Sequence, residues 1–410
     1  MTDSSAPRSA DIDEQIALLK RGAVDLVDEA QLRAKLLHSQ KTGTPLTVKT
    51  GFDPSSPDLH LGHTVLLRKM KHFQDLGHSV IFLIGGFTAR IGDPTGKKAT
   101  RPQLTEEEVT ANAQTYLRQV YRILDRERTL IDDNNRWLGA LGSAGLVRLA
   151  GRYTLARMME REDFRTRFQE NQPIHLHELL YPLAQGYDSV ALKADVELGG
   201  HDQIFNLRVG RDLMKEEGLA PQVVLTVPLL VGLDGSEKMS KSLGNAIAVE
   251  DPPKEIYGKT MSIPDALMWD WYLLLTDLPK DEIDRRKSAV AAGSLHPKEA
   301  KSELARRLVS QFHGEPEAQA AAAEFERVFA GGGVPDEISE VALSGSWSLG
   351  KLLPAAGLAS SNAEARRLLS QGAVAIDGSR VEDPHLELAP RPEPYLLKVG
   401  KRRFANLRLS

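Results

Sequence analysis

Alternating and periodic apolar positions between residues 46 and 85 predict a strand, a helix and a second strand. Residues 46–52 alternate and favour a strand, whereas residues 53–58 contain two prolines that a strand interior does not tolerate. The helix that follows carries apolar residues at steps of three or four positions and ends at Gly77. Residues 79–85 form a continuous apolar run, which is typical of a buried parallel strand. The segment is therefore predicted to be a right-handed βαβ unit.

Strand and helix patterns continue to alternate up to about residue 235, for example in the helical segment 106–124 and the strand candidate 221–231. This alternation predicts an α/β fold class, with a Rossmann-like, doubly wound parallel sheet in a first domain over residues 1–245. Ligands bind such sheets at the carboxyl ends of the strands, so residues 51–53 and 85–86 are expected beside a ligand.

The pattern becomes mostly helical after Ser242. Candidate helices cover residues 255–258, 267–276, 298–312 and an alanine-rich stretch at 318–330. A run of three glycines and a nearby proline then resembles a linker in composition. We therefore predict an α-helical domain over residues 246–330 and a linker over residues 331–345.

The remaining residues, 346–410, predict a small α+β domain. Ser361 and Glu364 form a capping-box pattern at the start of a helix over residues 362–371. The pair Asp377-Gly378 separates two short strand candidates and predicts a hairpin, and residues 395–407 predict a second hairpin about Gly400.

Composition and charge limit the kind of protein. The chain has 410 residues, 41% hydrophobic residues and no cysteine, which suits two or three soluble domains without disulfides. No apolar run has membrane-spanning length, and residues 1–14 lack the pattern of a secretory signal, so we expect a cytoplasmic protein without membrane contact. Residues 341–410 carry ten Lys and Arg against six Asp and Glu, within a chain of net charge −4, which favours a polyanionic partner at that end.

The run Asp-Leu-His-Leu-Gly-His at residues 58–63 begins the first predicted helix. His60 and His63 are three residues apart and therefore share a face at the helix N-terminus, where free N–H groups favour an anion. Gly62 lets a ligand approach the backbone, because it has no side chain. Two imidazole donors at this position suit the phosphates of a nucleotide, while a metal pair lacks a third ligand at suitable spacing.

The run Lys-Met-Ser-Lys-Ser at residues 238–242 follows a glycine-containing approach at residues 232–237. Lys238 and Lys241 offer two ammonium groups on a loop that could close over a triphosphate and neutralise departing pyrophosphate. Other nucleotide signatures are missing, because the sequence has no G-x-G-x-x-G, and residues 92–97 lack the spacing and hydroxyl of a P-loop.

These two runs, in this order, resemble the signature motifs of class I aminoacyl-tRNA synthetases. The segment Tyr-Pro-Leu-Ala-Gln-Gly-Tyr-Asp at residues 181–188 is similar to the tyrosine-binding helix of bacterial tyrosyl-tRNA synthetases. The resemblance implies activation of L-tyrosine by ATP with Mg as a companion ion, and transfer to the terminal adenosine of tRNA(Tyr). It also implies a homodimer and an RNA-binding C-terminal domain.

The resemblance implies roles for individual residues. Tyr181, Gln185 and Asp188 lie at helical spacing, and in the family the matching residues hold the substrate ammonium (the first two) and the phenolic hydroxyl (the third). Asp93 matches another ammonium ligand and Gln203 another tyrosine contact. The remaining matches belong to the nucleotide: Gly51, Asp53, Gly62, Gly200, Asp202 and Lys241. His60, His63, Lys238 and Lys241 are the expected catalytic residues, and no resident metal ligands are predicted.

Two positions depart from the family pattern. Lys49 stands where many members have a tyrosine that donates to the substrate hydroxyl, and His201 stands where small polar residues are usual. Three alternatives remain open from the residues alone: a tryptophanyl enzyme, a small-molecule adenylyltransferase, and a synthetase-derived RNA-binding protein without catalysis.

Overall fold

The computed structural model describes residues 11–95, 104–329, 338–400 and 403–410. The chain divides into two compact units, Met1–Glu315 and Pro316–Ser410, and each is described on its own. Among the described residues, no helix is long and apolar enough to span a bilayer.

The first unit contains a six-stranded sheet with the strand order β1-β6-β5-β2-β3-β4. Its strands are β1 (Leu26–Val27), β2 (Thr47–Phe52), β3 (Ser79–Ile84), β4 (Thr129–Asp133), β5 (Val196–Gly200) and β6 (Val223–Val227). Neighbours from β6 to β4 pair in parallel, and β1 adds an antiparallel edge to β6. Five of the six residues of β3 are buried, which explains the continuous apolar run there. The predicted doubly wound α/β fold class is confirmed.

The chain changes direction across the sheet between β2 and β5. From β2 it proceeds through β3 to β4, whereas β5 and β6 lie on the other side of β2. Val48 of β2 is in register with Val196 of β5, so the carboxyl ends of these two strands lie side by side. Such a switch point is where doubly wound sheets bind ligands.

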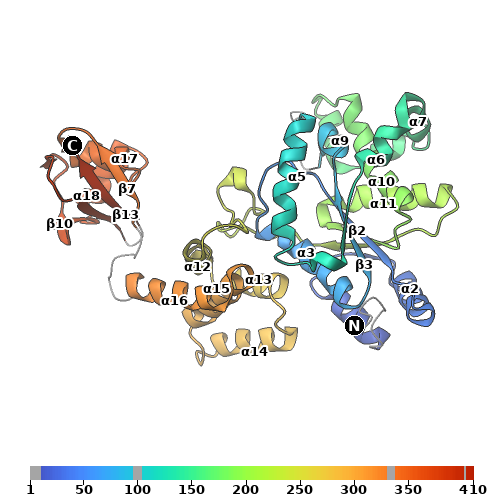
Figure 1. The fold of residues 1–410 in the computed structure, drawn as a ribbon, viewed down its shortest axis with the longest axis horizontal. Coiled ribbons are helices and arrows are strands. Elements are labelled where there is room, and N and C mark those ends of the chain that lie inside the picture. Colours follow the sequence, from blue (N-terminus) through green and yellow to red (C-terminus); the bar gives the residue numbers. More distant parts are fainter. Residues whose placement is uncertain (1–10, 96–103, 330–337, 401–402) are drawn as a thin grey trace. The chain divides into compact units, whose positions relative to one another are not determined.

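Helices cover both faces of this sheet. α3 (Leu61–Asp75) connects β2 to β3, and α11 (Ile204–Glu216) connects β5 to β6 on the other side of the strands (Figure 1). α10 (Tyr181–Leu192) packs against α11 and β2. The other helices before β6 are α1 (Ile12–Lys20), α2 (Glu29–Thr42), α4 (Thr88–Ile91), α5 (Glu106–Val120), α6 (Asn135–Leu138), α7 (Gly142–Ala150), α8 (Leu155–Met158) and α9 (Glu162–Gln169).

The helical region after the sheet contains α12 (Pro253–Ser262), α13 (Met268–Leu275), α14 (Lys280–Ala291) and α15 (Pro297–His313). The sequence predicted each of these helices except α14. The sequence pattern missed α14 because Ile283 is its one buried residue, so it has no apolar stripe to detect. All four helices belong to the same compact unit as the sheet, and a separate domain starting at residue 246 stays a prediction.

The second unit is built from α16 (Glu315–Phe329), whose last 14 residues it contains, and a small α+β fold. The five-stranded sheet has the order β10-β9-β12-β13-β7. Its strands are β7 (Glu340–Leu343), β9 (Val374–Ile376), β10 (Ser379–Val381), β12 (Tyr395–Val399) and β13 (Arg403–Leu409), with β8 (Trp347–Ser348) and β11 (Glu387–Leu388) as a separate pair. α17 (Leu349–Ala355) and α18 (Asn362–Ser370) share a buried core with the sheet.

The predicted linker is too long at its C-terminal end. Residues 340–343 form β7, which pairs in parallel with β13 and belongs to the small sheet. The glycines at residues 331–333 lie outside the described residues.

Both predicted hairpins are present, and Asp377 and Gly378 have the positive φ values (49° and 84°) that a tight hairpin turn requires. The predicted capping box is half correct. Ser361 accepts from the Glu364 amide at 3.2 Å, but the Glu364 carboxylate accepts from the amide of Ser360 at 2.7 Å.

Candidate active site

Two histidines cap the N-terminus of α3. His60 occupies the cap position, and its Nδ1 accepts the Gly62 amide at 3.1 Å. His63 reaches back, and its Nδ1 accepts the His60 amide at 3.1 Å. The ring centroids are 3.9 Å apart. The two imidazoles that the sequence singled out are therefore held together by the first turn of the helix.

The hydrogen bonds of the two rings determine where their protons lie. Since each Nδ1 accepts an amide proton, each neutral ring carries its own proton on Nε2. Burial lowers the pKa of His60 to about 2, with further lowering by His63 and Lys241. Burial also lowers the pKa of His63 to about 4, again assisted by Lys241. At neutral pH both rings are uncharged, and each offers one Nε2–H donor.

Gly62 lies directly under these rings. A Cβ at this position would lie 2.8 Å from Cε1 and 2.9 Å from Nδ1 of His60. Gly51, near the end of β2, is exposed and has no heavy atom within 4 Å of a Cβ position. The first glycine is required by the packing of His60, whereas the second leaves open space at the carboxyl end of the strand.

The loop that carries the two lysines is organised by Asn245. The Asn245 side chain accepts from the Ser240 amide at 2.7 Å, and it donates to the Lys238 carbonyl at 3.2 Å and to Asp234. Backbone donation from Ser236 and the Asn245 amide hold the pKa of Asp234 down to about 2. The expected flexible approach is therefore a hydrogen-bonded loop. Asn245 could not be predicted, because a lone polar residue after the motif has no recognisable pattern.

The histidine run and the lysine loop meet in space. Lys241 Nζ lies 2.8 Å from a carboxylate oxygen of Asp58, both side chains being partly exposed. The backbones of the adjoining segments also pair, since the Leu61 amide donates to the Ile247 carbonyl at 3.0 Å and Val249 donates to Leu59 at 2.9 Å. One group of ligand atoms can therefore contact both signatures.

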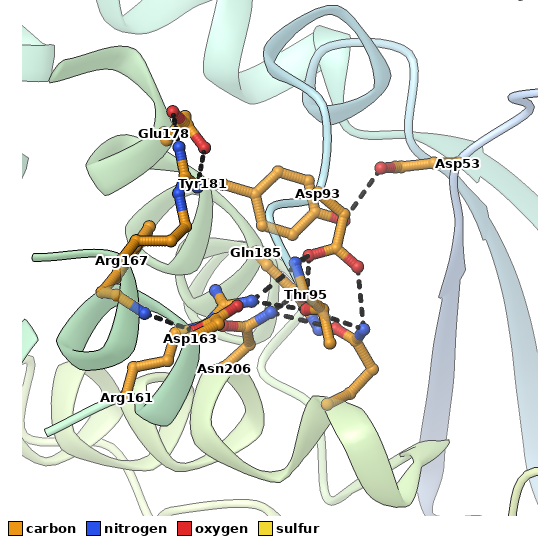
Figure 2. Close-up of polar contacts among 12 residues, drawn as sticks. Asp53, Asp93, Thr95, Arg161, Asp163, Arg167, Glu178, Tyr181, Gln185 and Asn206 are labelled. Carbon is orange, nitrogen blue, oxygen red and sulfur yellow. Dashed lines mark hydrogen bonds and ion pairs between the residues drawn. The ribbon is translucent and has the colours of Figure 1, made fainter. Parts of the chain in front are cut away.

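Asp53 lies at the carboxyl end of β2 and contacts α10. Its carboxylate accepts from the Tyr181 hydroxyl at 2.8 Å and from the Thr88 hydroxyl at 2.7 Å. Figure 2 shows the Tyr181 ring reaching from α10 toward Asp53. This contact joins a residue predicted for the nucleotide to a residue predicted for the amino acid.

Asp93, Gln185 and Gln203 are brought together by a polar network. Figure 2 labels Asp93, Gln185 and Asn206 of this network. Gln203 Nε2 donates to Asp93 at 2.9 Å, and Asn206 Nδ2 donates to Gln185 at 3.0 Å and to Gln203 at 2.9 Å. Arg161 completes the network through Asn206 at 3.1 Å and Thr95 at 2.5 Å. Sequence reasoning missed Arg161, Asn206 and Thr95, which no motif marks.

Asp188 is buried on the same helix as Tyr181 and Gln185. One carboxylate oxygen accepts from the Trp137 indole at 2.8 Å and the other from Asn134 at 3.2 Å. Burial raises the pKa of Asp188 to about 7, and the nearby charge of Lys49 opposes this rise. Asp188 is thus a carboxylate whose charge is sensitive to its surroundings at neutral pH.

Gly200 and Asp202 follow at the end of β5. A Cβ on Gly200 would lie 2.6 Å from an oxygen of Asp202. Burial raises the pKa of Asp202, Asp93 adds to the rise, and Lys238 opposes it, so Lys238 lies within electrostatic reach of this carboxylate. His201 points elsewhere, because its Nδ1 is 2.7 Å from Asp25. That contact accounts for the unusual histidine.

Comparison with known proteins places the chain in a family. The family described as "tRNA synthetases class I (W and Y)" matches residues 40–330, and the S4 domain matches residues 349–390. The chain belongs to this family of class I tRNA synthetases. The predicted family resemblance and fold class are confirmed.

Close relatives match nearly the whole chain. A tyrosine–tRNA ligase of Syntrophotalea carbinolica is 55% identical over 97% of this chain and 98% of its own length. A tyrosine–tRNA ligase of Haemophilus influenzae is 53% identical over 98% of both chains.

Solved structures share the fold. The tyrosyl-tRNA synthetase of Archaeoglobus fulgidus, in complex with L-tyrosine, has a TM-score of 0.62 at 25% identity and covers 76% of this class I chain and 100% of its own. A Plasmodium falciparum tryptophanyl-tRNA synthetase reaches a TM-score of 0.56 at 16% identity, covering 76% of this chain and 89% of its own. The fold is therefore common to both amino-acid specificities, whereas the high identities are to tyrosine–tRNA ligases.

Proposed function

We propose that this chain is a tyrosine–tRNA ligase, which activates L-tyrosine with ATP and transfers it to the terminal adenosine of tRNA(Tyr). The observation that carries the proposal is the contact of Lys241 with Asp58, beside the histidine pair and on the same sheet edge as Asp53 and Tyr181. The curated relatives, which match 97% of the chain at 53–55% identity, support the same activity.

In the first step the tyrosine carboxylate attacks the α-phosphorus of ATP. The bond from that phosphorus to the bridging oxygen breaks, and pyrophosphate leaves with the bonding electrons. Negative charge grows on the phosphate oxygens, where the Nε2–H groups of His60 and His63 can donate. A donor placed at developing charge accelerates such reactions by about 10²–10³-fold. No protein nucleophile takes part, since positioning and charge stabilisation are sufficient.

Lys238 and Lys241 are proposed to hold the β- and γ-phosphates. The loop brings Lys241 to the start of α3, and in the free enzyme Asp58 serves as its counter-ion. A bound triphosphate would take over that role, because it carries more charge than a single carboxylate. Lys238 lies within electrostatic reach of Asp202, which follows β5.

Magnesium enters this proposal as part of the MgATP substrate. Among the described residues, no group of three or more His, Cys, Asp or Glu side chains is arranged to hold a metal ion. The donors gathered around the histidine pair are N–H groups and ammonium groups, which suit phosphate oxygens and not a cation. We therefore assign no protein ligand to the ion.

The amino acid is proposed to lie across α10. Tyr181, Gln185, Asp93 and Gln203 form the polar end, which would hold the ammonium group, and the Asn206 network fixes their orientation. Asp188 would accept the phenolic hydroxyl. Phenylalanine would displace water from this buried carboxylate without supplying a hydroxyl donor, which penalises that substrate and gives a physical basis for the choice of tyrosine.

Several parts of the nucleotide would be bound through small residues and carboxylates. Gly51 and Gly62 leave space for backbone approach, Gly200 and Asp202 would contact the ribose, and Asp53 would lie near the adenylate. Asp53 already accepts from Tyr181, so the amino acid and the nucleotide would meet at this carboxylate.

The C-terminal unit is proposed to bind tRNA. Residues 349–390 match the S4 domain, and Arg366 and Arg367 of α18 are exposed while Ala365 and Leu369 of the same helix are buried. Exposed guanidinium groups on a basic domain suit phosphate contacts, which supply most of the affinity in nucleic-acid binding.

We also propose a cytoplasmic homodimer. Large exposed apolar side chains are frequent between β4 and α10, where Val147 is 72%, Leu155 64%, Phe168 69% and Leu176 82% exposed. Exposed apolar residues of this size are candidates for a contact with another protein. Sedimentation at micromolar concentration should give twice the chain mass, and replacing Leu155 and Phe168 by Asp should give the monomer mass.

Amino-acid-dependent ATP–pyrophosphate exchange tests the proposed activity. Each of the twenty amino acids is supplied in turn to the full chain with MgATP and labelled pyrophosphate. We expect exchange with tyrosine and background values with tryptophan and phenylalanine. Exchange with another amino acid in preference to tyrosine, or with none, would contradict the proposal. The second outcome is the one expected of an RNA-binding protein without catalysis.

A further inference from the structure

A buried ion pair lies against α10, the helix that carries part of the proposed tyrosine site. Lys49 of β2 and Glu197 of β5 are register partners across the switch point of the sheet. Their side chains are 1% and 2% exposed, and Lys49 Nζ is 2.6 Å from Glu197 Oε1. Neither residue was assigned a function by the sequence, although Lys49 was noted as a departure from the family pattern.

The stability of the fold does not account for this pair. Moving an ammonium and a carboxylate out of water costs several kcal/mol for each ion, and well-packed apolar residues of similar size are often as stable or more stable. The environment here satisfies Glu197, whose second oxygen accepts from Ser189 at 2.7 Å and from Gln222 at 2.8 Å. This ion pair is well supported by hydrogen bonds and lies at the switch point of the sheet, where ligands bind. Its charges are therefore candidates for a functional role.

Lys49 reaches the helix that carries the pocket residues. Its Nζ is 3.5 Å from the Gln185 carbonyl oxygen on α10. Asp188 follows Gln185 by three residues and so lies on the same face of that helix. Ser189, the next residue, contacts Glu197. The ion pair therefore packs against the turn of α10 that presents Asp188.

Lys49 and Glu197 act on Asp188 in opposite directions. The charge of Lys49 is the largest influence that lowers the pKa of Asp188, ahead of the hydrogen bonds from Trp137 and Asn134, whereas Glu197 raises it. Glu197 also holds the ammonium in place. The pair thus places the positive charge of Lys49 at a fixed position near Asp188. The negative charge of Glu197 partly offsets the effect of Lys49 on Asp188.

We propose that Lys49, held by Glu197, is a positioning residue that keeps Asp188 ionised in its buried pocket. The ionised carboxylate then selects a substrate that donates a hydrogen bond to it. An ionised carboxylate only accepts hydrogen bonds, while a protonated one also donates. This inference rests on the proposed binding of tyrosine at Asp188.

The pH dependence of tyrosine binding follows from this arrangement. Asp188 accepts a hydrogen bond from the substrate when it is ionised. The KM for tyrosine should therefore fall as the pH rises through about 7, which is the pKa of Asp188 in the enzyme without substrate. The charged groups that act on Asp188 are Lys49 and Glu197, and its hydrogen-bond donors, Trp137 and Asn134, do not titrate in this range.

Two variants with opposite expected effects test the inference in the tyrosine-dependent exchange assay from pH 6 to pH 9. Lys49→Met with Glu197→Gln removes both charges and retains side-chain size. Because the lowering influence of Lys49 is lost, the change in KM should move to higher pH by about one unit. At the wild-type midpoint, where half of the wild-type Asp188 is already protonated, this is a roughly fivefold higher KM. Discrimination against phenylalanine should fall in parallel.

Glu197→Gln alone leaves Lys49 as an unopposed positive charge. Its KM transition should therefore move to lower pH, opposite to the double variant. Arg167→Met with Glu178→Gln removes another buried ion pair, with side chains 3% and 2% exposed, and should leave the transition unchanged. A purely structural role would not produce shifts of opposite sign.

Identical transitions in wild type, the double variant and Glu197→Gln would overturn the inference. If the double variant does not fold, as judged by circular dichroism, the direction of the Glu197→Gln shift still decides. Loss of the proposed function gives a different result, because the wild-type enzyme would then show no tyrosine-dependent exchange at any pH.

Discussion

Lys241 and Asp58 are 183 positions apart in the chain, yet their side chains are 2.8 Å apart at the start of α3. The pairing of the adjoining backbone segments fixes this approach, since Leu61 and Val249 both donate across it. The lysine loop is therefore already docked beside the histidine pair before a nucleotide arrives. In the proposed reaction, a bound triphosphate would replace Asp58 as the partner of Lys241.

Lys241→Ala should slow tyrosyl-adenylate formation. Removing one charge-stabilising group costs about 10²–10³-fold in rate, while KM for tyrosine should stay within about twofold, because the proposed partners of Lys241 are the phosphates of ATP. Single-turnover adenylate formation and tyrosine titration measure the two effects. Lys280→Ala, which removes an exposed lysine on α14, is the control and should match wild type. A large loss of tyrosine affinity in Lys241→Ala would show that the assigned role is wrong.

Gly62→Ala should impair the histidine pair. The new Cβ would lie 2.8 Å from the His60 ring, so that ring must move away from the position that it holds at the helix cap. We expect the exchange rate to fall by roughly 10²-fold, the value of one displaced donor. Gly258→Ala on α12 is a suitable control, because no atom lies within 4 Å of its Cβ position. That control should retain full activity and gain about 0.5–1 kcal/mol of stability.

Lys69 should make the free energy of unfolding depend on pH. It is buried on α3, where it donates to the carbonyls of Leu19 at 2.9 Å and Arg21 at 2.7 Å. Burial lowers its pKa to about 7, and Arg21 and Arg68 contribute. Since the unfolded chain then binds more protons between pH 7 and its ordinary pKa near 10.5, this group makes stability rise with pH there, by at most about 1.4 kcal/mol per unit.

Urea unfolding at pH 7 and pH 9 measures this effect of Lys69, and Lys69→Met isolates it from other titrating groups. The difference in free energy of unfolding between wild type and Lys69→Met should change in favour of wild type as the pH rises. A difference that is constant between the two pH values would mean that Lys69 does not titrate in this window.

Deletion of residues 338–410 should separate the two reactions. The deleted residues contain the whole small sheet with its core and the S4 match, and leave the sheet of the first unit intact. Tyrosine-dependent exchange should remain within about threefold of wild type. Charging of tRNA(Tyr) should weaken by about tenfold or more, because the phosphate contacts proposed for the basic C-terminal unit would be lost. Charging at the wild-type level by the shortened enzyme would contradict the RNA-binding role.

Motifs and periodicity predicted the parts of the fold that repeat or carry a signature. The βαβ unit, the two hairpins and the approach of the histidine run to the lysine loop are present, because each depends on local patterning or on sheet topology. α14 escaped prediction because it buries one side chain. The loop organiser Asn245 and the network partners Arg161 and Asn206 also escaped, since single polar residues become partners only through tertiary packing.

Lys49 shows that the sequence can mark a residue as unusual without revealing its partners. The sequence marked it as unusual, but a lysine within a strand pattern gives no information about its partner. Only the register of β2 with β5 brings Glu197 opposite it, and only the packing of α10 brings Asp188 near.

The most direct test of the central claim is a double-mutant cycle between His60 and Lys241 on kcat/KM for ATP in the exchange reaction. His60→Asn is the suitable change, because Asn also caps a helix while it removes the imidazole Nε2–H. If both residues contact one nucleotide, the two losses should be non-additive by about 1 kcal/mol or more when His60→Asn is combined with Lys241→Ala. Losses that add to within about 0.5 kcal/mol would mean that the histidine pair and the lysine loop act independently.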